Sequence, residues 1–192
     1  MTSTSTPPWA PDTGHARGAA VTGTDGYLID VRAQITNGPD VFTIAGIRDT
    51  TVSPMRDRIR AAVLNSGLSW PGRTITVHLS PPGLHGCGLD LPVAVAVLTA
   101  AGTIPAGMTA PCLFVAELGL DGSLRPVRGV LPAATAAADA EPTVVIVAPD
   151  NAAEAVLAPG MSVFPCPSLR ASVYRQSGWS SQQAGSAAAR CS

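Results

Sequence analysis

The chain has 192 residues, of which 46% are hydrophobic and 13% are charged, and its formal net charge is -1 at pH 7. This length suits one domain with short tails and is sufficient to bury a core. The balanced charge gives no overall field that would attract nucleic acid or an anionic membrane, so either contact would need a local patch. The sequence contains no lysine, and its 12 basic residues are all arginine.

The four cysteines are widely spaced, and none forms a C-x-x-C pair of the kind that binds zinc or performs thiol exchange; they are Cys87, Cys112, Cys166 and Cys191. No metal site is therefore predicted. The longest apolar run, about 91–101, falls short of the roughly 20 residues that span a bilayer, and the start lacks the pattern of a signal peptide. We expect a cytoplasmic protein with reduced cysteines and no membrane contact.

Residues 1–17 are predicted to form a disordered tail, because the start of the chain is rich in Thr, Ser and Pro and lacks apolar periodicity. Residues 26–35 alternate apolar and polar side chains, as a strand does. The turn-forming sequence 37–39 then leads into 41–45, so the pattern predicts an opening hairpin.

A helix is predicted from Ser53, the N-cap, and Pro54, the first helical residue, to about residue 65. Its polar face carries Arg56, Arg58 and Arg60. We interpret this face as solvated, with its charges balanced by neighbours. The alternative is a patch for nucleic acid or for a partner protein.

Outside the central stretch described below, the apolar periodicity and the cap residues predict three further strands and two further helices. The strands are 73–79, 143–147 and 162–164, and the helices are 90–101, with Asp90 as N-cap, and 150–157, with Asp150 and Asn151 as the cap.

The stretch 115–132 is the most informative part of the chain. An apolar strand passes Glu117 and reaches Asp121-Gly122, a dipeptide typical of a two-residue type I′ turn, in which both central residues have positive φ. Asp121 and Gly122 are therefore interpreted as a structural turn. A second short strand and an alanine-rich helix follow, which indicates an α/β core.

Residues 119–132 read Gly-Leu-Asp-Gly-Ser-Leu-Arg-Pro-Val-Arg-Gly-Val-Leu-Pro. This order resembles the N-terminal domain of magnesium-chelatase-like ATPases of the ComM/YifB type. Residues 57–67, 70–77 and 90–98 agree with the same family in the same order. The resemblance implies an α/β fold similar to the Lon protease domain, with a two-layer mixed sheet and helices at 18–168. A short helix and a disordered tail would follow at 169–192. The family normally carries an AAA+ motor after this domain.

Inherited catalysis is not expected. Lon-type peptidases activate a serine with a lysine, but this chain has no lysine and no serine at 81–90. The family's Lys-acid-Gly signature in this loop is replaced here by His85-Gly86-Cys87-Gly88. No G-x-x-x-x-G-K-[ST] phosphate loop exists either, so ATP hydrolysis is not expected. One alternative remains: a repurposed hydrolase with Cys87 as nucleophile and His85 beside it.

The prediction is a non-enzymatic accessory domain without a cofactor. Its partner would be an AAA+ ATPase subunit or a second copy, and it would meet nucleic acid only indirectly. Arg125 and Arg128 are candidates for contacting carboxylates or phosphates of a partner. The structural explanation for both is pairing with Glu117 or Asp90. A nucleic-acid accessory module that works with an AAA+ helicase is the third class considered.

Overall fold

The computed structural model describes residues 12–47, 49–83, 88–105, 107–138, 140 and 142–178. Its strands are β1 (Asp12–Thr22), β2 (Asp25–Thr36), β3 (Phe42–Ala45), β4 (Thr74–Ser80), β5 (Cys112–Val115), β6 (Glu117–Leu118), β7 (Leu124–Arg125), β8 (Val144–Val147) and β9 (Ser162–Pro165). Its helices are α1 (Asp49–Asn65), α2 (Asp90–Ala100), α3 (Val130–Ala137), the 3-10 helix η1 (Pro149–Asn151), α4 (Ala152–Ala155) and α5 (Leu169–Gly178).

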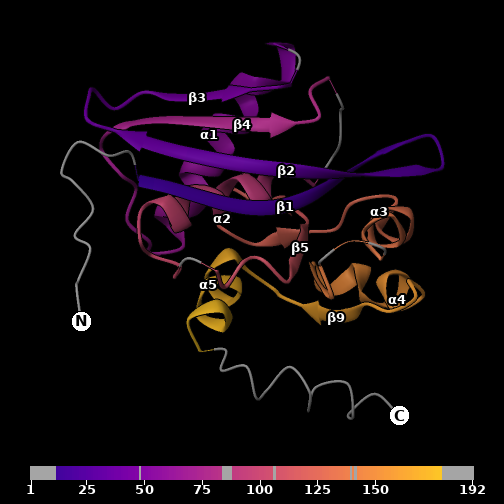
Figure 1. Ribbon diagram of the computed structural model, residues 1–192. Coiled ribbons are helices and arrows are strands. Elements are labelled where there is room, and N and C mark those ends of the chain that lie inside the picture. Colours follow the sequence, from indigo (N-terminus) through magenta and orange to yellow (C-terminus); the bar gives the residue numbers. More distant parts are fainter. Residues whose placement is uncertain are drawn as a thin grey trace, which may run out of the picture.

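The main sheet has the strand order β3-β4-β2-β1-β5-β8-β9 (Figure 1), and β6 and β7 form a separate pair. Strand β2 lies antiparallel to both β1 and β4. The remaining neighbours in the main sheet run parallel. The predicted α/β class with a mixed sheet is confirmed.

The predicted hairpin between 26–35 and 41–45 is wrong. Strand β2 pairs with β1, and β3 pairs in parallel with β4. The sequence gives little sign of β1, because the side chains of β1 that face the helices are small. At Gly14 an added Cβ would collide with the backbone of α2 at Ala96 and Ala100, so strand and helix approach closely only because no side chain is present.

The helices divide the sheet into two halves. Helices α1, α2 and α5 pack on one face, where Ile59, Leu91 and Leu169 share a core with β1, β2 and β5. Helices α3 and α4 cover the other face next to β1, β5, β8 and the start of β2, and Val130 and Ala155 belong to that second core. The β3-β4 side therefore has the expected two layers, and the rest of the sheet has a third.

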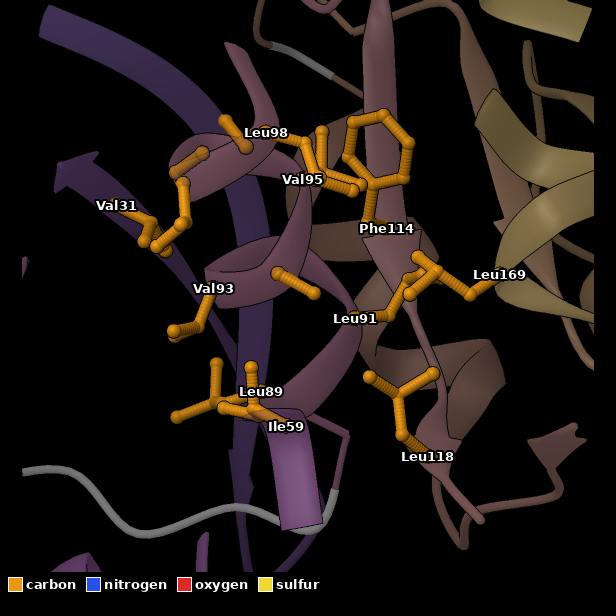
Figure 2. Close-up of a cluster of buried hydrophobic side chains, with 14 of the residues drawn as sticks. Val31, Ile59, Leu89, Leu91, Val93, Val95, Leu98, Phe114, Leu118 and Leu169 are labelled. Carbon is orange, nitrogen blue, oxygen red and sulfur yellow. The ribbon is translucent and has the colours of Figure 1, made fainter. Parts of the chain in front are cut away.

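Helix α2 is at the centre of the larger core, and every one of its residues is buried. Figure 2 shows its side chains directed toward Val31 of β2 on one side and toward Phe114 of β5 and Leu169 of α5 on the other. Valine has a modest helix propensity, so burial, rather than local preference, stabilises this valine-rich helix.

The predicted domain boundaries are too narrow at both ends. The 1–17 tail is wrong from Asp12 onward, because β1 begins there and pairs with β2 along its whole length. At the other end, the predicted short helix exists as α5, but it belongs to the domain: Leu169 is fully buried and Val173 is 3% exposed in the main core. The described domain therefore extends beyond 18–168 in both directions.

Helix α1 begins four residues before the predicted N-cap, at Asp49, so Pro54 lies inside the helix. Ser53 is consequently a helical residue and not the cap. Val52 packs partly buried against the core, which gives the additional turn a hydrophobic contact.

Candidate interaction site around the central turn

The turn between β6 and β7 is tight but is not the predicted type I′ turn. The Gly122 N–H donates to the Gly119 carbonyl at 2.9 Å, and the Gly119 N–H donates to the Ser123 carbonyl at 2.8 Å. Gly122 has a φ of 82°, whereas none of the described non-glycine residues has a positive φ. The turn is therefore a three-residue loop with Gly122 in the left-handed position of a bulge. Asp121 and Gly122 thus lie in a turn whose geometry differs from the predicted one.

Asp121 stabilises this loop locally. Its Oδ1 accepts hydrogen bonds from the Ser123 hydroxyl at 2.6 Å and from the Ser123 N–H at 3.0 Å. The bond from the Ser123 side chain is the main reason that the pKa of Asp121 lies below its ordinary value. The carboxylate is thus used inside the turn.

Three hydrogen bonds to neighbouring segments hold the turn in place. The Asn65 side chain at the end of α1 donates to the Leu120 carbonyl at 2.7 Å. The Leu169 N–H at the start of α5 donates to the Gly122 carbonyl at 2.8 Å, and the Leu124 N–H donates to the Pro167 carbonyl at 3.0 Å. Leu120 remains 59% exposed at the tip. The turn is therefore a fixed projection and not a free loop.

Arg125 and Arg128 follow this turn on a rigid backbone. Between them, Val127 is buried, and its N–H and carbonyl are bound by the Asn151 side chain at 2.9 Å each. Both arginines are exposed, and among the described residues neither guanidinium makes a hydrogen bond or an ion pair, although the charge of Arg125 interacts with the Asp121 carboxylate. The fold thus presents two charged groups at the end of β7 and on the fixed segment that follows it.

The carboxylates expected to pair with these arginines are bound by another residue. Arg58 of α1 makes a bidentate contact with Asp90, at 2.6 Å from Nε and 3.0 Å from Nη2, and its Nη1 lies 3.8 Å from Glu117. Asp90 also accepts the Leu118 N–H at 3.0 Å. The Asp90 side chain is 4% exposed, so this cluster joins α1, α2 and β6 as a structural unit.

The other two arginines of α1 are also bound within the fold. Arg56 donates to the Phe42 carbonyl at 3.0 Å, and Arg60 pairs with Asp40 at 2.5 Å while lying over the Trp70 ring at 5.7 Å. This face connects α1 to the β3 side of the sheet. It therefore does not form an unoccupied basic patch.

His85 and Cys87, the candidate thiol site, fall outside the described residues. Asp90, the first acidic residue after them, is held by Arg58. Cys112 and Cys166 are buried. Among the residues that the structure places, no cluster of His, Cys, Asp or Glu has a geometry suited to a metal ion. Within the same ranges, no helix combines the length and hydrophobicity needed to cross a bilayer.

Sequence reasoning missed the roles of two residues near the site. Asn151 was expected to cap a helix, but it makes no capping bond and instead binds Val127. Glu154 of α4 accepts the Leu131 N–H at 3.0 Å, so it satisfies the first turn of α3. Both contacts join segments more than 20 residues apart, and local patterns carry no signal for such pairs.

Comparison with known proteins gives consistent matches. The family model described as subunit ChlI of Mg-chelatase matches residues 31–151. The uncharacterized protein Rv2897c of Mycobacterium tuberculosis is 44% identical over 153 residues, which cover 78% of this chain and 30% of that protein. Competence protein ComM of Haemophilus influenzae is 36% identical over 144 residues, or 74% of this chain and 28% of ComM. YifB of Escherichia coli is 38% identical over 148 residues, or 76% and 29%. The chain thus spans less than a third of each relative.

Proposed function

The chain belongs to the magnesium-chelatase-like ComM/YifB family, and from this premise we propose that it is a non-catalytic interaction domain that binds an AAA+ ATPase subunit. The resemblance to ComM/YifB-type proteins implies such a motor next to this domain. The proposed place of action is the cytoplasm. No cofactor is needed for this role.

The observation that carries the proposal is the presentation of Arg125 and Arg128. Asn151 fixes the backbone between them, while the guanidinium groups remain exposed. The backbone of this segment is already fixed, so binding a partner would cost little entropy apart from that of the two arginine side chains. A segment of this kind suits recognition of carboxylates on a partner. The exposed Leu120 at the neighbouring turn adds an apolar contact.

The test is binding to E. coli YifB from which the matched 148-residue segment has been removed. We expect this chain to bind that protein, and the double charge reversal Arg125→Glu, Arg128→Glu to weaken binding at least about tenfold. Surface plasmon resonance at two salt concentrations measures both effects. Sedimentation velocity of the chain alone tests self-association, the other expected mode.

Arg32→Glu is the matched control, because it reverses an exposed arginine on β2 and should leave partner affinity unchanged. Equal loss of binding in both variants would indicate a general charge effect and would contradict a specific Arg125/Arg128 surface. A wild-type chain that binds neither YifB nor itself would contradict the proposal as a whole.

The hydrolase alternative makes a separate prediction. A thiol-directed activity probe would label Cys87 faster than free cysteine, because a nucleophilic thiol needs a lowered pKa. Under our proposal, labelling proceeds at the ordinary rate and the His85→Ala variant behaves like wild type. Direct binding of nucleic acid through α1 is disfavoured, because Arg56, Arg58 and Arg60 are bound within the fold.

A further inference from the structure

The β3-β4-β2 half of the sheet carries a polar face that α3 covers only at the start of β2, where Gly26 lies against Pro132. Along β2, Ile29, Val31 and Ala33 are buried against the helices, so the alternate residues, including Asp30 and Arg32, project to the opposite side. Figure 1 shows this half of the sheet in front, with α1 and α2 behind it and α3 beside it.

Three nitrogen-bearing side chains form a row across this face. In the strand register, Arg32 is directly opposite His15 of β1 on one side and His78 of β4 on the other. Directly opposed residues in an antiparallel sheet project to the same face. With strands about 4.8 Å apart, the row spans roughly 10 Å.

The acidic residue closest to this row is already neutralised. Asp30 Oδ1 lies 3.0 Å from His15 Nε2 and 3.6 Å from Arg17 Nε. Arg32 is exposed, and within the described part of the chain neither it nor His78 makes a hydrogen bond or an ion pair. Because Asp30 is engaged by His15 and Arg17, the charge of Arg32 is left uncompensated on a chain whose net charge is -1.

The row lines a cavity of about 660 Å³. No Asp or Glu is among the described lining residues, so nothing there repels an anion. Beyond the row, the wall is made of small and hydroxyl- or amide-bearing residues, among them Thr13, Gln34 and Thr99. This volume falls within the range of small-molecule sites, and such walls suit a hydroxyl-rich group.

We propose that this cavity binds a small phosphorylated molecule, with its phosphate on Arg32 and its hydroxyl-bearing part toward Thr13 and Gln34, which are opposite each other on the same face. The planar guanidinium provides two parallel donors that match a phosphate, and His78 provides a further donor beside it. This site is distinct from the Arg125/Arg128 surface and does not depend on the function proposed for that surface.

Ribose 5-phosphate, ribose and inorganic phosphate are the probes, measured by isothermal titration calorimetry on the full chain. We expect saturable binding of ribose 5-phosphate, weaker binding of phosphate, and none of ribose. Arg32→Gln should reduce the affinity for ribose 5-phosphate at least about tenfold, and His78→Gln should reduce it by a smaller factor. Arg170→Gln, an exposed arginine on α5, should bind as wild type.

Thermal unfolding of Arg32→Gln should match wild type, because within the described ranges Arg32 makes no hydrogen bond or ion pair that the substitution would remove. The proposal is overturned if ribose 5-phosphate does not saturate by about 10 mM. It is also overturned if ribose binds equally well or if Arg32→Gln retains full affinity. A single-stranded oligonucleotide that binds through Arg32 while ribose 5-phosphate does not would replace the small molecule with a nucleic-acid backbone.

Discussion

The side-chain amide of Asn151 makes two hydrogen bonds to the backbone of Val127, one to its N–H and one from its own NH₂ to the carbonyl, both at 2.9 Å. Asn151 is 5% exposed, so water does not readily replace these bonds. The contact connects η1 to the segment between Arg125 and Arg128. The position of the proposed partner surface therefore depends on a residue 24 positions away.

Asn151→Ala should destabilise the domain by about 1 to 3 kcal/mol, because it leaves a buried N–H and a buried carbonyl without partners. Asn151→Asp keeps an acceptor for the N–H but places a negative charge against the carbonyl, so it should not rescue the loss. Urea denaturation measures both. Equal stability of Asn151→Ala and wild type would show that the contact is dispensable.

Asp90→Ala should cost about 3 kcal/mol or more, because it leaves the partly buried Arg58 guanidinium and the Leu118 N–H without their acceptor. Glu117→Ala should cost less than about 1 kcal/mol, since that side chain is 35% exposed and its contact with Arg58 is 3.8 Å. The comparison uses urea midpoints of the two variants. A larger effect at Glu117 than at Asp90 would contradict the assigned hierarchy.

Gly122→Ala should be more destabilising than Gly23→Ala. Both glycines have positive φ, so both substitutions introduce backbone strain of about 1 kcal/mol. A Cβ at Gly122 would also collide with the Ser66 hydroxyl, whereas nothing lies within 4 Å of one at Gly23. Thermal and urea unfolding of the pair separates crowding from strain. Matching losses would show that Ser66 moves aside freely.

Asp121→Asn should lower stability near neutral pH, and the difference from wild type should vanish in acid. The pKa of the folded-state carboxyl lies below its ordinary value of 3.8, so the charged form favours the folded state. Its contribution is fully present above that ordinary value and disappears as pH falls through the folded-state pKa. Urea unfolding from about pH 7 to about pH 3 follows the difference. In a Ser123→Ala background the effect should shrink, because the main cause of the shift is gone.

Removal of residues 1–11 should leave the thermal midpoint nearly unchanged, as the composition of that segment predicts. Removal of 1–17 should lower the midpoint by several degrees or prevent folding, because six positions of β1 would lose their pairing with β2. Circular dichroism during heating measures both. Equal midpoints for the two deletions would show that the first half of β1 contributes little.

The sequence predicted the elements that carry strong local signals. Alternation revealed β2 and β4, and apolar runs revealed β5 and β8. Prediction from the sequence failed for residues whose role depends on a contact with a distant part of the chain. Gly14 resembles a tail residue until α2 is packed on it, and Asn151 resembles a cap until Val127 is beside it.

The candidate site shows the same division. The turn at Gly122 followed from its dipeptide, but the bonds from Asn65 and Leu169 that fix it did not. The arginines of α1 gave no sign of which carboxylate each would meet, because charge pairing across a fold depends on topology that one sequence does not reveal. The His15, Arg32 and His78 row required the register of three strands before it could be recognised.

Helix α2 has no side that faces water, and this affects how the chain folds while it is being synthesised. A nascent chain that has emerged only as far as Ala100 carries a helix that is apolar except for Asp90 and Thr99, and its cover is missing on the Phe114 and Leu169 side (Figure 2). That cover arrives only after about 70 more residues have been synthesised, so the helix is a target for chaperones or proteases until then. Stable folding is therefore expected only after α5 has left the ribosome, and a gene broken between α2 and α5 should yield two fragments that aggregate when made separately.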